Sequence, residues 1–163
     1  MEGAEHAMQH DEQQMDCCAV SDAEVHAPKQ TCPRCGVRGR RVKPITLSSL
    51  LKPGASLPED AWRFCQTPAC TAVYFGESSK AILEAAQLSV RVGLKESRSD
   101  RPICYCFGFT AADIEAAARH PVTVFQQVTE HCRRGEDRCK QTNPQGICCL
   151  GNIRAIERTA LEK

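Results

Sequence analysis

Aromatic residues are scarce in this sequence: they make up 5% of its 163 residues, with a single tryptophan. A hydrophobic core of ordinary size is difficult to build from so few large side chains, so we expect bound metal to supply part of the stability. The sequence also has no apolar window approaching the roughly 18 residues of a membrane-spanning helix. We therefore expect no membrane insertion.

Residues 1–29 lack the apolar stretch and the leading positive charges of a secretory signal, and carry seven acidic residues against Lys29 alone. We therefore expect a cytoplasmic protein that begins with a disordered acidic tail over residues 1–30. Cytoplasmic thiols stay reduced, so clustered cysteines there bind metal more often than they form disulfides. The sequence also shows no nucleophile–base pair and no phosphate-binding loop, so we do not expect a conventional enzyme.

Cysteine, by contrast, is abundant: the sequence contains twelve, and most of them belong to two sets defined by their spacing. The first set has the spacing C-x2-C-x29-C-x4-C and comprises Cys32, Cys35, Cys65 and Cys70. Two close pairs of thiolates suit tetrahedral zinc, and the glycine after the first pair permits the positive φ of a metal-binding turn. The alternatives are structural disulfides or buried thiols. With no histidine or carboxylate set beside it as a base, the zinc site is predicted to be structural.

The second set has the spacing C-x-C-x32-C-x8-C-C and comprises Cys104, Cys106, Cys139, Cys148 and Cys149. Zinc sites rarely use a C-x-C pair with a distant loop, whereas a [2Fe–2S] cluster needs four thiolates shared between two irons. The first and last of these cysteine runs precede predicted helices. Helix N-termini favour buried anions, which fits an anionic cluster.

The motifs "CPRCG", "FCQTPACTAVYF" and "CYCFGFT…CKQTNPQGICC" together resemble the N-terminal domain of the CopZ-type iron–sulfur and zinc copper metallochaperones. The second half is similar to bacterioferritin-associated ferredoxin domains. The resemblance covers residues 31–162 and implies one zinc and one [2Fe–2S] cluster. Its cluster ligands would be Cys104, Cys106 and Cys139, with Cys149 favoured over Cys148 as the fourth. CopZ-type domains are typically joined to a copper-binding domain with an M-x-C-x-x-C motif, which these residues do not contain.

Four cysteines remain outside the two ligand sets: Cys17, Cys18, Cys132 and one of the Cys148–Cys149 pair. Cys132 is predicted to be a half-buried apolar residue. Cys17 and Cys18 share the N-terminal tail with three methionines and three histidines, and thiolate, thioether and imidazole groups suit Cu(I) and other soft ions such as Hg(II). They are a candidate soft-metal site, and the alternative of a tail whose composition is accidental stays open. A run of basic residues after the first knuckle lacks interleaved aromatics, so we expect a charged strand edge and no nucleic-acid binding.

The predicted fold class is α+β. A first lobe over residues 31–96, of zinc-ribbon or treble-clef type, is expected to contain strands at residues 40–46, 61–65, 72–75 and 89–94 and a helix at 78–87. A second lobe over residues 97–163 is expected to be helical and to bind the [2Fe–2S] cluster. Its helices are predicted from a capping box at Thr110 and Asp113, after Pro121, and over residues 152–162.

The leading functional hypothesis is a metallochaperone that handles copper or mercury and passes it to a metal-transport ATPase or another metal-resistance protein. The resemblance also implies reduction of Cu(II) to Cu(I) by the cluster. The alternatives are a [2Fe–2S] electron-transfer protein and a redox- or metal-sensing regulator.

Overall fold

The computed structural model describes residues 30–163 and confirms the α+β class. The acidic tail predicted for residues 1–30, with Cys17 and Cys18, lies outside the described residues except for Gln30. Within the described part of the chain, no helix has both the length and the apolar character needed to cross a membrane.

The first lobe is built on a four-stranded antiparallel sheet in the order β1-β2-β3-β4. Its strands are β1 (Arg40–Arg41), β2 (Trp62–Phe64), β3 (Ala72–Gly76) and β4 (Ile82–Glu84). All five residues of β3 are buried: Val73 and Tyr74 belong to the hydrophobic core, and Ala72 and Phe75 pack with the first cysteine set. The sheet therefore joins the core of the lobe directly to its cysteines.

Three predictions for the first lobe were wrong. The strand expected over residues 40–46 ends at Arg41 and gives way to helix α1 (Pro44–Leu50), which has proline in its first turn. The helix expected over residues 78–87 is replaced by β4 and a 3-10 turn, because pairing with β3 outweighs local helix propensity. Residues 89–94 form no strand, and a Cβ at Gly93 would lie 1.8 Å from the Pro102 carbonyl oxygen.

The second lobe combines a short hairpin with four helices. The hairpin strands are β5 (Pro102–Cys104) and β6 (Phe109–Thr110), and the helices are α2 (Ala111–Ala117), α3 (Val124–Arg133), α4 (Cys139–Thr142) and α5 (Leu150–Leu161). The predicted capping box of Thr110 and Asp113 is confirmed at the start of α2. The hairpin was not predicted. Ile114, Val128 and Ile153 bring α2, α3 and α5 together around one core.

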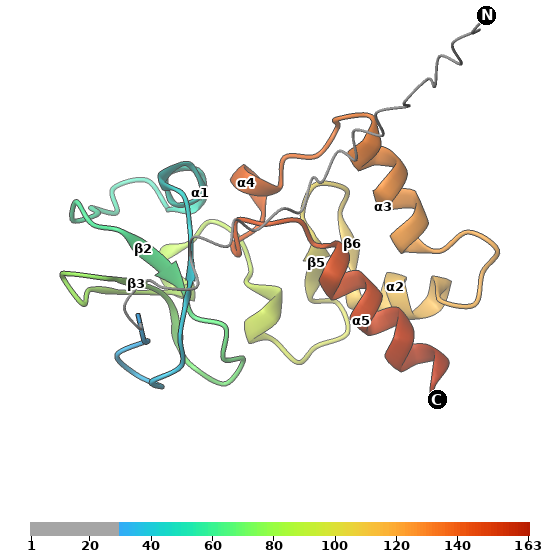
Figure 1. Ribbon diagram of the computed structural model, residues 1–163, viewed down its shortest axis with the longest axis horizontal. Helices are drawn as coiled ribbons and strands as arrows, with labels where there is room; N and C mark the ends of the chain where they lie inside the picture. The colour runs from blue at the N-terminus through green and yellow to red at the C-terminus, as the bar shows by residue number, and fades with distance from the viewer. Residues whose placement is uncertain (1–29) are drawn as a thin grey trace, which may run out of the picture.

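The two lobes meet through α4 and the loop that follows it. Figure 1 shows β2, β3 and α1 at one end of the molecule, α2, α3 and α5 at the other, and α4 between them beside α1. The buried Tyr74 hydroxyl of β3 donates a hydrogen bond to the Pro144 carbonyl at 2.6 Å, and the Thr46 hydroxyl of α1 donates to the Lys140 carbonyl at 2.7 Å. The first lobe thus holds the segment between Cys139 and Cys148.

Replacing Tyr74 with phenylalanine should test this support. The substitution keeps the ring but leaves the buried Pro144 carbonyl without its donor, so we expect the free energy of unfolding to fall by about 1–3 kcal/mol. Denaturant unfolding of the metal-loaded protein would measure the change. An unchanged unfolding midpoint would show that the hydrogen bond contributes nothing to holding the loop.

Candidate metal sites

The first cysteine set forms a compact cage. The Sγ atoms of Cys32 and Cys70 lie 3.9 Å apart, and those of Cys35 and Cys65 lie 3.6 Å apart. Within residues 30–163, these four form the one group of three or more cysteine, histidine or acidic side chains whose ligand atoms all lie within 4.8 Å. A tetrahedral ion with Zn–S bonds of about 2.3 Å requires S···S separations of about 3.8 Å. The cage therefore has the size of a single zinc ion.

The chain forms this cage by folding a tight turn around the first pair. The Gly36 amide donates to the Cys32 carbonyl at 2.8 Å, and Gly36 has a φ of +71°, which glycine adopts without a steric cost. Backbone N–H groups point at the sulfurs: those of Arg34 and Cys35 at Cys32, and that of Val37 at Cys35. Such donors stabilise thiolate ligands.

The thiols of the first cage differ in pKa. Burial acts to raise the pKa of Cys35, but hydrogen bonds from the Thr67 hydroxyl, the Val37 amide and the neighbouring thiols outweigh it and lower the pKa to about 6. Burial raises the pKa of Cys70 to about 12, partly offset by the Ala72 amide. A thiolate at Cys35 is therefore available near neutral pH to begin metal binding.

The cage is closed. Cys32 and Cys65 are buried against Ala72 and Phe75, and all four ligand positions of a tetrahedron would be filled by sulfur. No histidine or carboxylate joins the group of ligand atoms found in residues 30–163. A closed four-cysteine site leaves no position for water or substrate, which is the pattern of structural zinc.

The second cysteine set also converges, from three separate segments. Cys104 ends β5, Cys106 lies in the hairpin turn and Cys139 begins α4, with its Sγ atom 3.6 Å from that of Cys106. Cys104 and Cys149 are buried in one core, and Cys106 packs against it. The structure therefore brings together the four thiols predicted as cluster ligands. Cys148, the predicted alternative, precedes Cys149 in the chain and is only partly buried.

The surroundings of this second set suit an anionic cluster. The Arg138 amide donates to Cys106 Sγ at 3.2 Å, and Cys149 is the N-cap of the 12-residue helix α5, whose positive dipole end favours negative charge. The hydrogen bond with Cys149, opposed by burial, lowers the pKa of Cys104 to about 7. Among the described residues, no three sulfur atoms of the second set all lie within 4.8 Å of one another, whereas the four of the first set do. This wider spacing suits a centre that contains two metal atoms.

Comparison with known proteins identifies the family of this chain and gives a zinc-binding match over its first lobe. Residues 29–89 match the CopZ family model described as a zinc binding domain. The copper chaperone CopZ of Archaeoglobus fulgidus is 34% identical over 128 residues, which are 77% of this chain and 60% of that protein. The X-ray structure of its N-terminal domain aligns with 77% of this chain and 96% of the solved chain, at 30% identity and a TM-score of 0.63. The chain belongs to the CopZ-type N-terminal domain family.

The match spans about 60% of the length of the full copper chaperone. Within this CopZ-type domain, both cysteine sets fall inside the two lobes described above. No disulfide joins the ten cysteines of residues 30–163.

Asn143, which was not predicted from the sequence, holds the turn that precedes Cys148. Asn143 is 2% exposed, and its amide group donates to the Ile147 carbonyl at 2.7 Å while its side-chain oxygen accepts from the Gln145 amide at 3.0 Å. Gly146 completes the turn with a φ of +66°. The sequence "NPQG" signals a turn, but only the structure shows that the turn sets the position of the vicinal cysteines.

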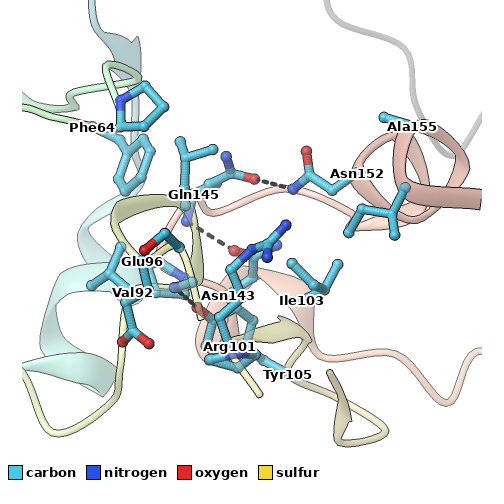
Figure 2. Close-up of a pocket in the computed structure, with 17 residues that line it drawn as sticks. Phe64, Val92, Glu96, Arg101, Ile103, Tyr105, Asn143, Gln145, Asn152 and Ala155 are labelled. Carbon is cyan, nitrogen blue, oxygen red and sulfur yellow. Dashed lines mark hydrogen bonds between the residues drawn. The ribbon is translucent and has the colours of Figure 1, made fainter. Parts of the chain in front are cut away.

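A cavity of about 470 Å³ lies between the two lobes of the CopZ-type domain. Figure 2 shows Phe64 and Val92 on one side of it and Ile103 and Asn152 on the other, with the Asn152 amide donating to Gln145 at 2.7 Å. Its lining contains no cysteine. The cavity is therefore separate from both metal sites.

Proposed function

We propose that this CopZ-type domain is a cytoplasmic metallochaperone component that carries two resident metal centres and handles a soft metal, copper or mercury. The observation that carries the proposal is the presence of two separate thiol cages of different size in one chain. Membership of the CopZ family supplies the metal-handling context.

Zinc is the resident metal proposed for the first cage, with Cys32, Cys35, Cys65 and Cys70 as ligands. The S···S separations, the N–H···S donors and the closed all-sulfur coordination support this assignment. Its role is structural, because the site joins the knuckle to the sheet of a lobe with a small core. The zinc-ribbon or treble-clef character of the lobe stays a prediction.

A [2Fe–2S] cluster is proposed for the second cage, with Cys104, Cys106, Cys139 and Cys149 as ligands. Cys149 is preferred to Cys148 because it is buried in the same core as Cys104, against which Cys106 packs. When bound, such a cluster supplies a one-electron redox centre, and one electron converts Cu(II) to Cu(I). The protein's part is to hold the four thiolates, exclude water through the apolar second core and direct amides at the sulfurs.

The cargo and partner follow from the family relation. We propose a soft-metal ion as cargo and a metal-transport ATPase or another metal-resistance protein as recipient. A carrier of this kind releases its cargo unchanged or reduced by one electron, so we do not propose an enzyme with an active site of its own. Cys17 and Cys18 remain a proposed cargo site, because thiolates select soft ions.

Titration with Cu(I) or Hg(II) without oxygen tests this function. We expect the zinc- and iron-loaded protein to bind at least one soft ion tightly without losing either resident metal. Serine substitution of Cys17 and Cys18 should reduce that binding if the tail contributes. A protein that binds no soft metal but passes electrons to an iron-storage partner would instead be an electron carrier. DNA binding that weakens steeply with salt would indicate a regulator.

A further inference from the structure

The cavity between the two lobes has the properties of a ligand-binding site. Its volume of about 470 Å³ falls in the range of about 300–1,000 Å³ that is typical of small-molecule pockets, which often form between structural units. Phe64 and Val92 of the first lobe and Ile103 and Ile156 of the second give it apolar walls (Figure 2). Arg101, which also lines it, is partly exposed, so a ligand can enter from solvent.

Arg101 brings to this cavity a cation that forms no ion pair with a carboxylate of residues 30–163. Of the five N–H groups of its guanidinium, one donates to the Arg98 carbonyl at 3.2 Å. The nearest acidic residues in the chain are engaged elsewhere. Glu96, which also lines the cavity, pairs with Arg91, and Asp100 pairs with Arg91 and Arg98. The cavity lining therefore favours an anion, and a planar guanidinium matches the two oxygens of a carboxylate.

Two side-chain amides share the lining with Arg101. The Asn152 amide donates to the Gln145 side-chain oxygen at 2.7 Å, and this bond leaves the Gln145 Nε2 group, with its two N–H donors, for an anion. The Tyr105 hydroxyl accepts from the Gly93 amide and donates to a backbone carbonyl, both at 2.9 Å, so this residue offers the cavity its ring. The lining thus combines a few donors suited to negative charge with apolar and aromatic surface.

We propose that this cavity binds a small organic carboxylate with an apolar body. The carboxylate oxygens accept hydrogen bonds from the Arg101 guanidinium and the Gln145 side-chain amide, and the body of the ligand packs between Phe64 and Ile103. Hydrogen bonds between charged groups are stronger than neutral ones, so the site selects an acid over the matching amide. The proposal goes beyond the proposed function and does not depend on it, because no cysteine lines the cavity.

Calorimetric titration of the full chain, loaded with its metals, tests this site. The probe is phenylacetate, a carboxylate on an aromatic body, and phenylacetamide is its uncharged match. We expect phenylacetate to bind with a Kd on the order of 1 mM, as a ligand of about ten non-hydrogen atoms allows, and phenylacetamide to bind at least about 10-fold more weakly. Arg101→Gln should weaken phenylacetate binding by about 10- to 100-fold. Arg119→Gln, which changes an exposed arginine outside the cavity, should leave it unchanged.

Three results would overturn the inference: no binding of phenylacetate, equal binding of the acid and the amide, or equal phenylacetate affinity in the parent and in Arg101→Gln. Metal contents equal to those of the parent would show that the variants are folded. If Arg101→Gln loses its metals, Arg101→Lys replaces it, with a smaller expected weakening because lysine keeps the charge but not the planar fork. The comparison of acid with amide in the unsubstituted chain decides the proposal in either case. Soft-metal binding is measured separately, so failure here leaves the proposed function standing.

Discussion

Serine in place of Cys35 is expected to abolish zinc binding and to unfold the first lobe. Cys35 supplies one of four sulfurs in a cage whose S···S separations match a single tetrahedral ion, and its thiol has the lowered pKa that favours early binding. Structural zinc contributes on the order of 10 kcal/mol to folding of small domains. That exceeds the total stability of most domains, so the small core of this lobe should not compensate.

Zinc analysis and circular dichroism of the Cys35→Ser protein would measure the effect, with Cys132→Ser as a cysteine-to-serine control that should retain zinc. Iron content should also fall, because Thr46 and Tyr74 of the first lobe hold the loop between Cys139 and Cys148. A folded Cys35→Ser protein with full zinc content would show that Cys35 is not a ligand.

Serine in place of Cys139 is expected to remove the iron and the visible absorption while leaving zinc in place. Cys139 is buried, and its Sγ atom lies 3.6 Å from that of Cys106 in the second cage. A [2Fe–2S] cluster requires four thiolates, and three would not hold it stably. The α2, α3 and α5 core should remain folded, since its contacts are formed by Ile114, Val128 and Ile153.

The vicinal pair provides the matched comparison for this prediction. Cys149→Ser should behave like Cys139→Ser, because Cys149 is buried in the same core as Cys104, whereas Cys148→Ser should retain iron. Iron and sulfide analysis of the three variants would show which of them retain the cluster. Full iron content in Cys139→Ser would contradict the proposed ligand set.

The grouping of the cysteines could be predicted because part of each cage is local in sequence. The C-x-x-C and C-x-C pairs fix two sulfurs within one turn, and the partners are the next cysteines of suitable spacing. The structure brings the predicted thiols together in both cases. Their roles as zinc and cluster ligands remain predictions, as does the zinc-ribbon character of the lobe.

The errors in the fold arose where tertiary contacts outweigh local preference. Residues 78–87 contain alanine, glutamate, lysine and leucine, which favour a helix, yet Ile82–Glu84 pairs with a buried strand. The hairpin around Cys104 and Cys106 was missed because its strands are short and their pairing depends on a turn at Gly108. Helix α2, in contrast, was predictable because the capping box of Thr110 and Asp113 is local.

Features that depend on distant residues could not be read from the sequence. The hydrogen bonds between Tyr74 and Pro144 and between Thr46 and Lys140 each depend on segments brought together by the whole fold. The support that the first lobe gives to the loop between Cys139 and Cys148 therefore became visible only in the structure.

Metal and sulfide analysis of the protein purified without oxygen tests the central claim most directly. Two thiol cages of different size predict about one zinc ion per chain, together with about two irons and two acid-labile sulfides and the visible absorption of a [2Fe–2S] cluster. A colourless protein that contains zinc but neither iron nor sulfide would contradict the account of the second cage and the redox function built on it.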